Sequence, residues 1–247
     1  MKLKGQTFII TGASRGIGAA LVMELAKAGA NVVLGARNKG ALETVREAAK
    51  GLGVEAAAVA GSVADDGVAR QLVEAAKALG NFAGFVHNAG ILNAGPLVVE
   101  LPEPQYDEIL ESNLKGGYQL ARYSYPNLRP QGGVAVFLGS GVAEHHIPGM
   151  GIYGVAKAAE EYLARQLALE APEVTCFIYR PGIVETDMQR QLRAAEGGGA
   201  TALRPLFQGY KTQGRVLSPE QSARTLVRIL EGEAHKFHGK IATYRDA

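Results

Sequence analysis

Short apolar runs that alternate with longer segments of helical periodicity are the feature that most constrains the fold of this chain. Several of the runs are apolar at consecutive positions, which is typical of strands covered on both faces. We therefore expect strands at residues 7–11, 31–35, 54–60, 84–87, 133–138, 174–179 and 240–244. The segments between them carry the apolar spacing of helices, which we expect at residues 17–28, 40–52, 65–79, 105–128, 153–169 and 218–230.

The order of these elements predicts the topology. A strand, a helix and a second parallel strand form a right-handed crossover, and repetition of that unit builds a parallel sheet. The sequence therefore predicts an α/β fold of the Rossmann type, which is a doubly wound, seven-stranded parallel sheet with helices on both faces. We expect residues 1–247 to form one such domain, because no linker-like change of composition divides the chain before about residue 190.

Residues 186–217 depart from the alternation of strands and helices. They contain three consecutive glycines at 197–199, Pro205 and scattered apolar residues. This composition is too polar for a core and too apolar for a simple linker. We interpret the segment as a mobile flap that covers a substrate pocket.

Charge and composition exclude several classes of protein. The 26 Lys and Arg residues nearly balance the 24 Asp and Glu residues, which argues against nucleic acid as the main partner. No apolar stretch approaches the ~20 residues of a membrane span or the about 7–15 of a signal-peptide core. Cys176 is the single cysteine, and no cluster of His, Asp or Glu has metal-ligand spacing. We expect a cytoplasmic protein without a disulfide or a metal.

A glycine-rich turn follows the first expected strand directly. Residues 11–18 read TGASRGIG, and a helix begins within them. Glycines at such a junction let the chain turn tightly and let a pyrophosphate approach the N–H groups at the positive end of a helix. The first strand–helix junction is also where doubly wound sheets bind dinucleotides, so we expect a dinucleotide here.

The spacing of Gly12, Gly16 and Gly18 resembles that of the short-chain dehydrogenases/reductases, and the likeness covers residues 4–244. In the glycine turn, the resemblance implies cofactor contacts from Gly12, Ser14, Arg15, Gly16, Ile17 and Gly18. Elsewhere it implies contacts from Ser62, Val63, Asn88, Ala89, Gly90, Tyr153, Lys157, Pro181, Gly182, Ile183 and Thr186. One departure is that Ser62-Val63 replaces the Asp-Val that the family usually has near the adenine amino group.

The end of the second expected strand bears on the choice of cofactor. An NAD enzyme of this fold carries an acid there to hold the ribose hydroxyls, whereas an NADP enzyme uses cations. Ala36 stands where the family has its acid, Arg37 follows it, and Arg15 lies in the glycine turn. Two guanidinium groups without a carboxylate suit the 2′-phosphate of NADP(H), which we expect as the cofactor. The alternative is that both arginines are solvated surface residues.

Tyr153 and Lys157 form the expected catalytic pair. They are four residues apart on an expected helix and share one face, and a cation beside a phenol favours its ionisation. Ser140 lies thirteen residues before Tyr153, at the end of the fifth expected strand, as in the family that the chain resembles. The resemblance implies that Tyr153 donates a proton and that Ser140 binds the substrate carbonyl oxygen. It also implies that Asn113 holds a water in a relay toward Lys157.

Two further groups of residues suggest contacts with substrate or with a second subunit. His145 and His146 follow the fifth expected strand near the mouth of the site, where a loop histidine is usually solvated and a substrate contact is the alternative. The family often forms its subunit interface on the helix expected at residues 105–128. We expect a homodimer or homotetramer, with core or interface packing by the tyrosines of that helix, Tyr106, Tyr118 and Tyr123.

The leading function is an NADPH-dependent oxidoreductase that reduces the carbonyl of a ketone, diketone or aldehyde to an alcohol. Residues 181–189 and 239–244 most resemble the sepiapterin reductase and benzil reductase subgroup of the family. The alternatives are a 3-oxoacyl thioester reductase, a catalytically silent NADP-binding regulatory protein, and an epimerase or dehydratase. Silent relatives usually lack the tyrosine or the lysine, and epimerases typically have a larger C-terminal domain, so we rank both below a reductase.

Overall fold

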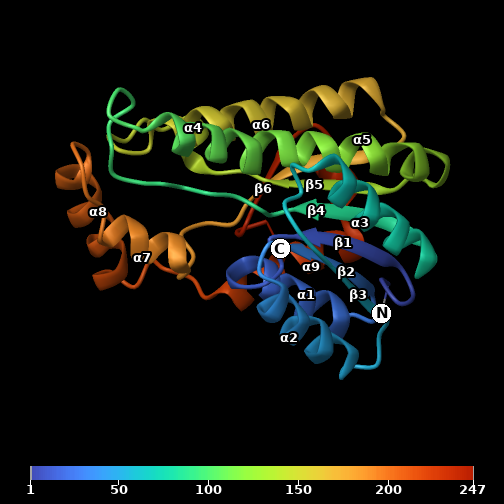
Figure 1. Ribbon diagram of the computed structural model, residues 1–247. Coiled ribbons are helices and arrows are strands. Elements are labelled where there is room, and N and C mark those ends of the chain that lie inside the picture. The colour runs from blue at the N-terminus through green and yellow to red at the C-terminus, as the bar shows by residue number, and fades with distance from the viewer. Residues whose placement is uncertain (1, 247) are drawn as a thin grey trace.

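The computed structural model describes residues 2–246, which form one seven-stranded sheet with every strand parallel to its neighbours (Figure 1). The strands are β1 (Thr7–Thr11), β2 (Asn31–Ala36), β3 (Ala56–Ala60), β4 (Phe82–His87), β5 (Val134–Leu138), β6 (Thr175–Arg180) and β7 (Ile241–Thr243). Across the sheet they run in the order β3-β2-β1-β4-β5-β6-β7. The expected doubly wound fold is confirmed, and no strand end differs from its expected position by more than two residues.

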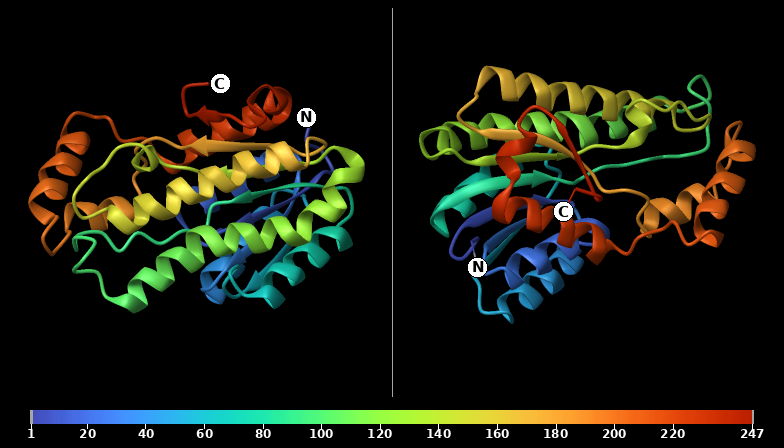
Figure 2. Two further views of the ribbon diagram at one scale, coloured as in Figure 1. Left: turned by 90° about the horizontal axis from the view of Figure 1, so that it is seen from above. Right: turned by 180° about the vertical axis from the view of Figure 1, so that it is seen from behind.

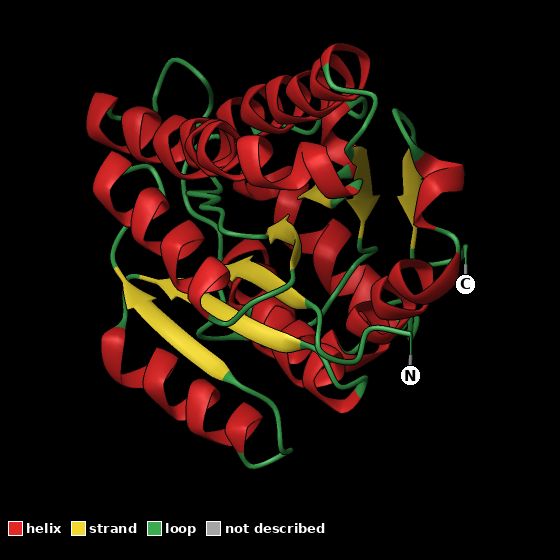
Figure 3. Ribbon diagram, turned by 90° about the vertical axis from the view of Figure 1, so that its right-hand side faces the viewer, coloured by secondary structure: helices red, strands yellow, loops and turns green. Residues whose placement is uncertain are grey.

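Helices cover both faces of this sheet (Figure 3). They are α1 (Gly16–Lys27), α2 (Lys39–Lys50), α3 (Asp66–Ala78), α4 (Glu103–Leu110), α5 (Gly116–Leu128), α6 (Gly151–Glu170), α7 (Asp187–Arg193), α8 (Ala200–Thr212) and α9 (Pro219–Gly232). Helices α1, α2 and α9 lie against one face, and α3, α5 and α6 lie against the other. Within residues 2–246, none of the helices combines the length and the apolar character needed to cross a membrane.

The buried faces of the sheet explain why its strands are apolar at consecutive positions. In β1, Phe8 and Ile10 belong to the core under α1 and α9, whereas Ile9 between them belongs to the core under α3 and α5. In β6, Phe177 and Ile178 divide in the same way. Side chains alternate between the two faces of a strand, so a sheet covered on both sides needs apolar residues at every position.

The single helix expected at residues 105–128 is interrupted. Helices α4 and α5 are joined by a π-helical turn at Glu111–Lys115, and Asn113 lies in the middle of that turn. A π-turn inserts one residue into a helix and frequently occurs at functional sites. The interruption turns Asn113 into the protein interior, where the side chain is fully buried.

The order of the strands reverses between β1 and β4, and this is the position at which an open parallel sheet forms a crevice for ligands. The carboxyl ends of β1 and β4 are held together by side chains at this point. Thr11 Oγ1 accepts hydrogen bonds from the backbone N–H groups of Asn88 and Ala89, each 3.1 Å long. Asn88 Nδ2 donates in return to the Thr11 carbonyl over 2.9 Å.

Residues 186–217 form helices α7 and α8, which lie apart from the main layers (Figure 2). The apolar residues that are scattered along this segment in the sequence come together in the structure. Leu192, Leu203 and Phe207 are buried in a separate apolar cluster that includes Tyr153. Both helices bury one apolar side toward that cluster, which the short and irregular spacing of their apolar residues conceals in the sequence.

The three glycines between α7 and α8 allow two backbones to approach closely. Gly199 N–H donates to the Gly95 carbonyl over 2.8 Å, and Gly95 N–H donates to the Gly149 carbonyl over 2.9 Å. A methyl group on Gly199 would overlap the backbone of Gly149. Gly197 has a φ of +97°, a conformation that favours glycine. The glycines therefore attach the segment to the loops around the site, besides shaping the turn.

Candidate active site

A cavity of about 1460 Å³ opens at the carboxyl ends of the strands, at the reversal of strand order. It is lined by nearly all of the residues that the sequence marks as functional: Gly12, Ser14, Arg15, Gly16, Ile17, Arg37, Ser62, Val63, Asn88, Ala89, Gly90, Ser140, Tyr153, Lys157, Pro181, Gly182, Ile183 and Thr186. The two exceptions are Gly18 and Asn113, which lie behind the cavity wall.

The glycine turn has the geometry of an anion-binding cradle. Gly12 and Gly16 have φ angles of +65° and +56°, which favour glycine. Gly18 lies beneath the turn, where a methyl group would overlap the Gly12 carbonyl. The first turn of α1 has no side-chain cap and no acidic residue, so its N–H groups remain available to an anion. These features fit the pyrophosphate of a dinucleotide.

Ser140, Tyr153 and Lys157 meet in the inner part of this cavity. Ser140 follows β5, and the other two side chains project from the first turns of α6. Lys157 Nζ lies 5.9 Å from the centre of the Tyr153 ring and donates a 2.7 Å hydrogen bond to the Leu138 carbonyl. The sequence therefore identified three side chains that the fold brings together.

The charges around Tyr153 and Lys157 shift both groups. Burial raises the pKa of the Tyr153 phenol, while the Lys157 charge and hydrogen bonding from Ser140 oppose that rise. Burial disfavours the Lys157 ammonium group, but Glu160 and Tyr153 outweigh burial and raise its pKa. Lys157 is consequently a cation, and Tyr153 is a protonated phenol at neutral pH.

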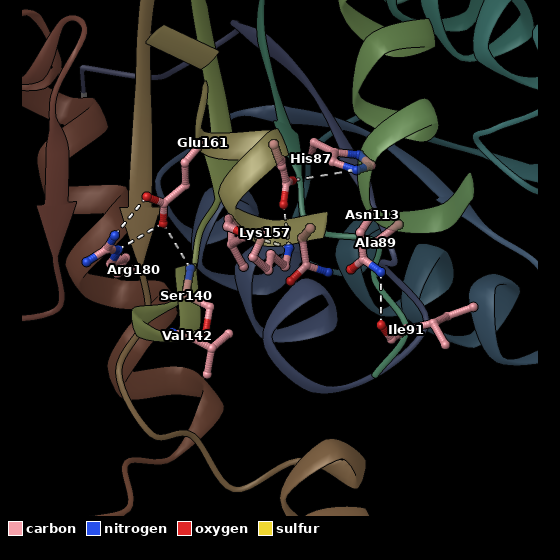
Figure 4. A network of polar contacts seen from close by, with 12 residues as sticks. His87, Ala89, Ile91, Asn113, Ser140, Val142, Lys157, Glu161 and Arg180 are labelled. Carbon is pink, nitrogen blue, oxygen red and sulfur yellow. Dashed lines mark hydrogen bonds and ion pairs between the residues drawn. The ribbon is translucent and has the colours of Figure 1, made fainter. Parts of the chain in front are cut away.

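Asn113 faces this pair from the π-turn. Its Nδ2 donates to the carbonyls of Ile91 and Ile109 over 2.9 and 2.7 Å, while its Oδ1 has no hydrogen-bond partner (Figure 4). A methyl group on Gly90 would contact both Asn113 Oδ1 and Lys157 Nζ, so both atoms lie close to Gly90. An acceptor without a partner beside Lys157 is compatible with the expected water site.

Glu161 and Arg180 support Ser140 and were not identified from the sequence. Glu161 is 2% exposed, and its Oε1 accepts a 3.2 Å hydrogen bond from the Ser140 backbone N–H. The Arg180 guanidinium donates to both carboxylate oxygens of Glu161 over 2.9 and 2.7 Å (Figure 4). Arg180 also pairs with Glu144 in the loop after Ser140. This network fixes the end of β5 from which Ser140 projects.

Glu160 and His87 are two more residues that sequence analysis missed. Glu160 accepts a 2.6 Å hydrogen bond from Lys157 Nζ, and His87 Nε2 lies 3.8 Å from its other carboxylate oxygen. Both side chains are completely buried. The sequence does contain a signal for Glu160. It lies three residues after Lys157 and seven after Tyr153, which places all three on one helix face.

The two arginines expected to bind the 2′-phosphate lie at the opposite, exposed end of the cavity. The Arg37 side chain is 63% exposed and pairs with Glu108 over 2.9 Å. The Arg15 side chain is 71% exposed and pairs with Asp187 over 2.6 Å. Both arginines line the cavity, and each is already engaged by an acid that sequence analysis did not pair with it.

The remaining candidates lie at the mouth of the cavity or away from it. His145 is exposed and lines the cavity, as the substrate-contact hypothesis requires, whereas His146 does not line it. Cys176 is buried in β6 and makes a hydrogen bond to a backbone carbonyl. Among residues 2–246, no three His, Cys, Asp or Glu side chains are grouped so that they could hold a metal ion.

Known proteins share this sequence and this arrangement. The short chain dehydrogenase family matches residues 6–197. An uncharacterised oxidoreductase of Saccharomyces cerevisiae is 31% identical over 248 aligned positions, which cover 98% of this chain and 96% of the yeast protein. A 3-oxoacyl-acyl-carrier-protein reductase of Pseudomonas aeruginosa is 33% identical over 200 positions, which cover 79% of this chain and 81% of that reductase. The chain is therefore an oxidoreductase of the short-chain dehydrogenase/reductase family.

Solved structures agree with that assignment. The crystal structure of the yeast relative has a TM-score of 0.88 at 27% identity and covers 98% of this chain and 96% of its own. An alcohol dehydrogenase from the archaeon Thermococcus sibiricus, complexed with 5-hydroxy-NADP, has a TM-score of 0.81 at 26% identity, with 96% and 95% covered. A 7α-hydroxysteroid dehydrogenase complexed with NADH has a TM-score of 0.86 at 26% identity, with 99% and 94% covered. The family thus binds nicotinamide cofactors of both types.

Proposed function

We propose that this protein reduces the carbonyl group of a ketone, diketone or aldehyde to an alcohol with NADPH. The observation that carries the proposal is the meeting of Ser140, Tyr153 and Lys157 in one cavity with an uncapped helix N-terminus. The balanced reaction consumes one carbonyl compound, one NADPH and one proton and yields one alcohol and one NADP⁺. The nicotinamide, when bound, supplies the hydride that reaches the carbonyl carbon.

The side chains of this protein supply the remaining parts of the reaction. The Ser140 hydroxyl orients the carbonyl oxygen and stabilises the negative charge that develops on it. The Tyr153 phenol donates its proton to that oxygen as the C=O π bond becomes the C–O⁻ of the alkoxide. Lys157 stabilises the phenolate that remains until Tyr153 is reprotonated. Tyr153 and Lys157 are buried, and their burial excludes water that would weaken these interactions.

The proposed preference for NADPH rests on Ala36, Arg37 and Arg15. No carboxylate stands at the end of β2, and both guanidinium groups line the cavity. A 2′-phosphate would compete with Glu108 for Arg37 and with Asp187 for Arg15. Breaking these ion pairs offsets part of the free energy of the new contacts. We therefore expect the preference for NADPH over NADH to lie at the low end of the range for two charge-assisted hydrogen bonds.

A second candidate function is the reduction of 3-oxoacyl thioesters. It is favoured by the 33% identity with the 3-oxoacyl-acyl-carrier-protein reductase of Pseudomonas aeruginosa. The likeness of residues 181–189 and 239–244 to the sepiapterin and benzil reductase subgroup favours a diketone or a pteridine instead. Both reactions use the same three catalytic side chains, so the shape of the pocket decides between them.

We also propose that a second copy of the chain packs on the surface of α6. Val155, Tyr162 and Leu169 are exposed and spaced by seven residues, so they form one apolar stripe along that helix. Tyr106 and Tyr118 add exposed aromatic surface on α4 and α5. Tyr123, the third tyrosine of the helix expected at residues 105–128, hydrogen-bonds Asp66 of α3. A homodimer or homotetramer would bury the stripe, and light scattering of the purified protein tests this.

The decisive experiment measures NADPH consumption against a panel of aldehydes, diketones, pteridines and 3-oxoacyl thioesters. We expect turnover with at least one class, and the class that gives the highest kcat/KM identifies the substrate type. The Tyr153→Phe variant is the control, because it removes the proposed proton donor and leaves the cofactor site in place. Equal NADPH consumption by the variant, or none with any carbonyl class, would refute the proposed reaction.

A further inference from the structure

The buried carboxylate of Glu160 is the most unusual charge near the catalytic pair. It is 0% exposed, and its Oε2 lies 2.6 Å from Lys157 Nζ. Its Oε1 has no hydrogen-bond partner. A buried carboxylate is costly unless a cation compensates it, and Lys157 is the only cation bonded to it within the described residues. Glu160 and Lys157 therefore form an ion pair behind Tyr153.

His87 of β4 faces the free oxygen of this carboxylate. Its Nδ1 lies 3.0 Å from Thr11 Oγ1, which already accepts two backbone N–H groups. A hydroxyl oxygen has two acceptor sites, so Thr11 must donate its own hydrogen to His87 Nδ1. The neutral imidazole then carries its proton on Nε2, which points toward Glu160 Oε1 at 3.8 Å.

The charged groups that face Glu160 come from two elements. From α6 they are Lys157, which favours the carboxylate, and Glu161, which opposes it. From β4 there is His87, whose pKa burial lowers to about 3, so that it stays neutral. Arg180 of β6 compensates the charge of Glu161 through two hydrogen bonds. The pair formed by Lys157 and Glu160 is thus left close to electrical neutrality.

The neutral pair formed by Lys157 and Glu160 affects the pKa of Tyr153. A lone Lys157 ammonium group would stabilise the phenolate and bring its pKa toward the physiological range. A carboxylate bonded to that ammonium group cancels much of its effect at the phenol, and Glu160 raises the pKa of Tyr153 where Lys157 lowers it. Burial also raises the pKa of Glu160 itself, but only to about 7, below the pH at which a phenol ionises.

We propose that Glu160 is a positioning residue that holds Lys157 and keeps Tyr153 protonated, so that the site favours carbonyl reduction over alcohol oxidation. This inference rests on the proposed function, because it assumes that Tyr153 donates the proton. Above about pH 7, where Glu160 is ionised, its carboxylate keeps the phenol protonated. Because His87 stays neutral, it does not compete with Lys157 for the charge of Glu160.

The test is the pH dependence of kcat/KM in both directions for Glu160→Gln, which removes the charge and keeps the shape. We expect the pH at which reduction falls to half its maximum to drop by about one to two units, since a unit charge a few ångströms away has an effect of this size. Oxidation of the product alcohol should gain activity at neutral pH. Glu160→Asp, which retains the charge, should return both profiles toward those of the wild type.

The matched control is Glu170→Gln, an exposed carboxylate on the same helix. It should leave both pH profiles and KM for NADPH unchanged. A purely structural role for Glu160 predicts lower stability and lower kcat with an unmoved pH profile, and that result would overturn the proposal. An equal shift in Glu160→Gln and Glu170→Gln would overturn it as well.

A second measurement needs no known substrate. The ultraviolet difference spectrum between the wild type and Tyr153→Phe, followed against pH, reports the ionisation of Tyr153. We expect its pKa at or above the ordinary tyrosine value of about 10. A value below about 8 would show that the Lys157 charge acts unopposed, and the proposal would fail. The same titration in Glu160→Gln should give a lower pKa for Tyr153, and an unchanged pKa would overturn the proposal. If no carbonyl compound is reduced, the proposed function fails, while this pair of titrations still tests the role of Glu160.

Discussion

The charged side chains at the two ends of the cavity lie in opposite environments. At the inner end, Tyr153, Lys157 and Glu160 are buried among apolar side chains. At the outer end, Arg15 and Arg37 stand mostly in solvent, each paired with an acid. Charges interact strongly where water is excluded and weakly where water and salt screen them. We therefore expect chemistry to depend on single side chains, and cofactor preference to depend on several small contributions.

The largest effect should come from Tyr153→Phe at the inner end. Loss of a positioned general acid lowers turnover by about 10²–10⁴-fold. NADPH affinity, measured by fluorescence titration, should stay close to that of the wild type, because the phenol oxygen is the only atom removed. Turnover of the variant near the wild-type rate would mean that another group donates the proton and that the inner end is not the reaction site.

The next largest effect concerns stability and tests how fully the inner end is closed to water. Burial lowers the pKa of His87 to about 3, below the ~6.5 of an unfolded chain. Between these values the unfolded chain binds one more proton than the native state, so stability falls as the pH falls from about 6.5 toward 3. Urea unfolding should show this loss in the wild type, with a slope from His87 of up to about 1.4 kcal/mol per pH unit.

His87→Asn should remove that contribution, while His235→Asn, at an exposed position, should retain it. The comparison is made between the pH dependences of the two variants, because the asparagine at position 87 also changes packing. Parallel curves for the wild type and His87→Asn would show that His87 is not buried in its neutral form. Water would then reach the inner end, and the contrast with the outer end would disappear.

A smaller effect is expected for the choice of cofactor at the outer end. NADPH should be preferred over NADH in kcat/KM by about tenfold, since exposed ion pairs contribute about 0.2–1 kcal/mol each. Ala36→Asp combined with Arg37→Ile should reverse the preference, because the new carboxylate accepts the ribose hydroxyls and repels the phosphate. A preference for NADH in the wild type would mean that Arg15 and Arg37 pair only with Asp187 and Glu108 and do not bind the 2′-phosphate.

Glu108→Gln sharpens the same comparison. It frees Arg37 from its ion pair and keeps the side chain the same size. We expect the preference for NADPH to rise by up to about fivefold, the equivalent of one exposed ion pair. An unchanged ratio of kcat/KM values would show that Arg37 does not reach the 2′-phosphate.

The smallest effect should appear in the local stability of helices α7 and α8. These helices share an apolar cluster with Tyr153 of the inner end, and Asp187 of α7 pairs with Arg15 of the outer end. We propose that residues 186–217 exchange their amide hydrogens faster without ligands than with NADPH and substrate. Both helices lie apart from the main layers (Figure 2), and the apolar cluster that holds them is small. Equal protection with and without ligands, measured by hydrogen exchange, would show a fixed cover instead of a flap.

The contrast between the two ends also marks where sequence interpretation succeeded. The turn at Gly12 and Gly16, the helix spacing of Tyr153 and Lys157, and Ser140 after β5 are local patterns, and all of them line the cavity. The partners of these residues were missed. Asp187 is 172 positions from Arg15, and Glu108 is 71 positions from Arg37, so no local spacing relates them.

The elements and their order follow from the sequence alone, because strand and helix periodicities and glycine conformations act over a few residues. The sequence also indicated the place of the cavity, since the glycine-rich turn marks the first strand–helix junction, where doubly wound sheets bind dinucleotides. Which charges are buried, and which groups they contact, depends on the packing of the folded chain. His87 in β4 and Glu160 in α6 are 73 positions apart in the chain, and they face each other only because the fold brings these elements together. Burial then gives that contact its electrostatic strength, which no pattern along the chain expresses.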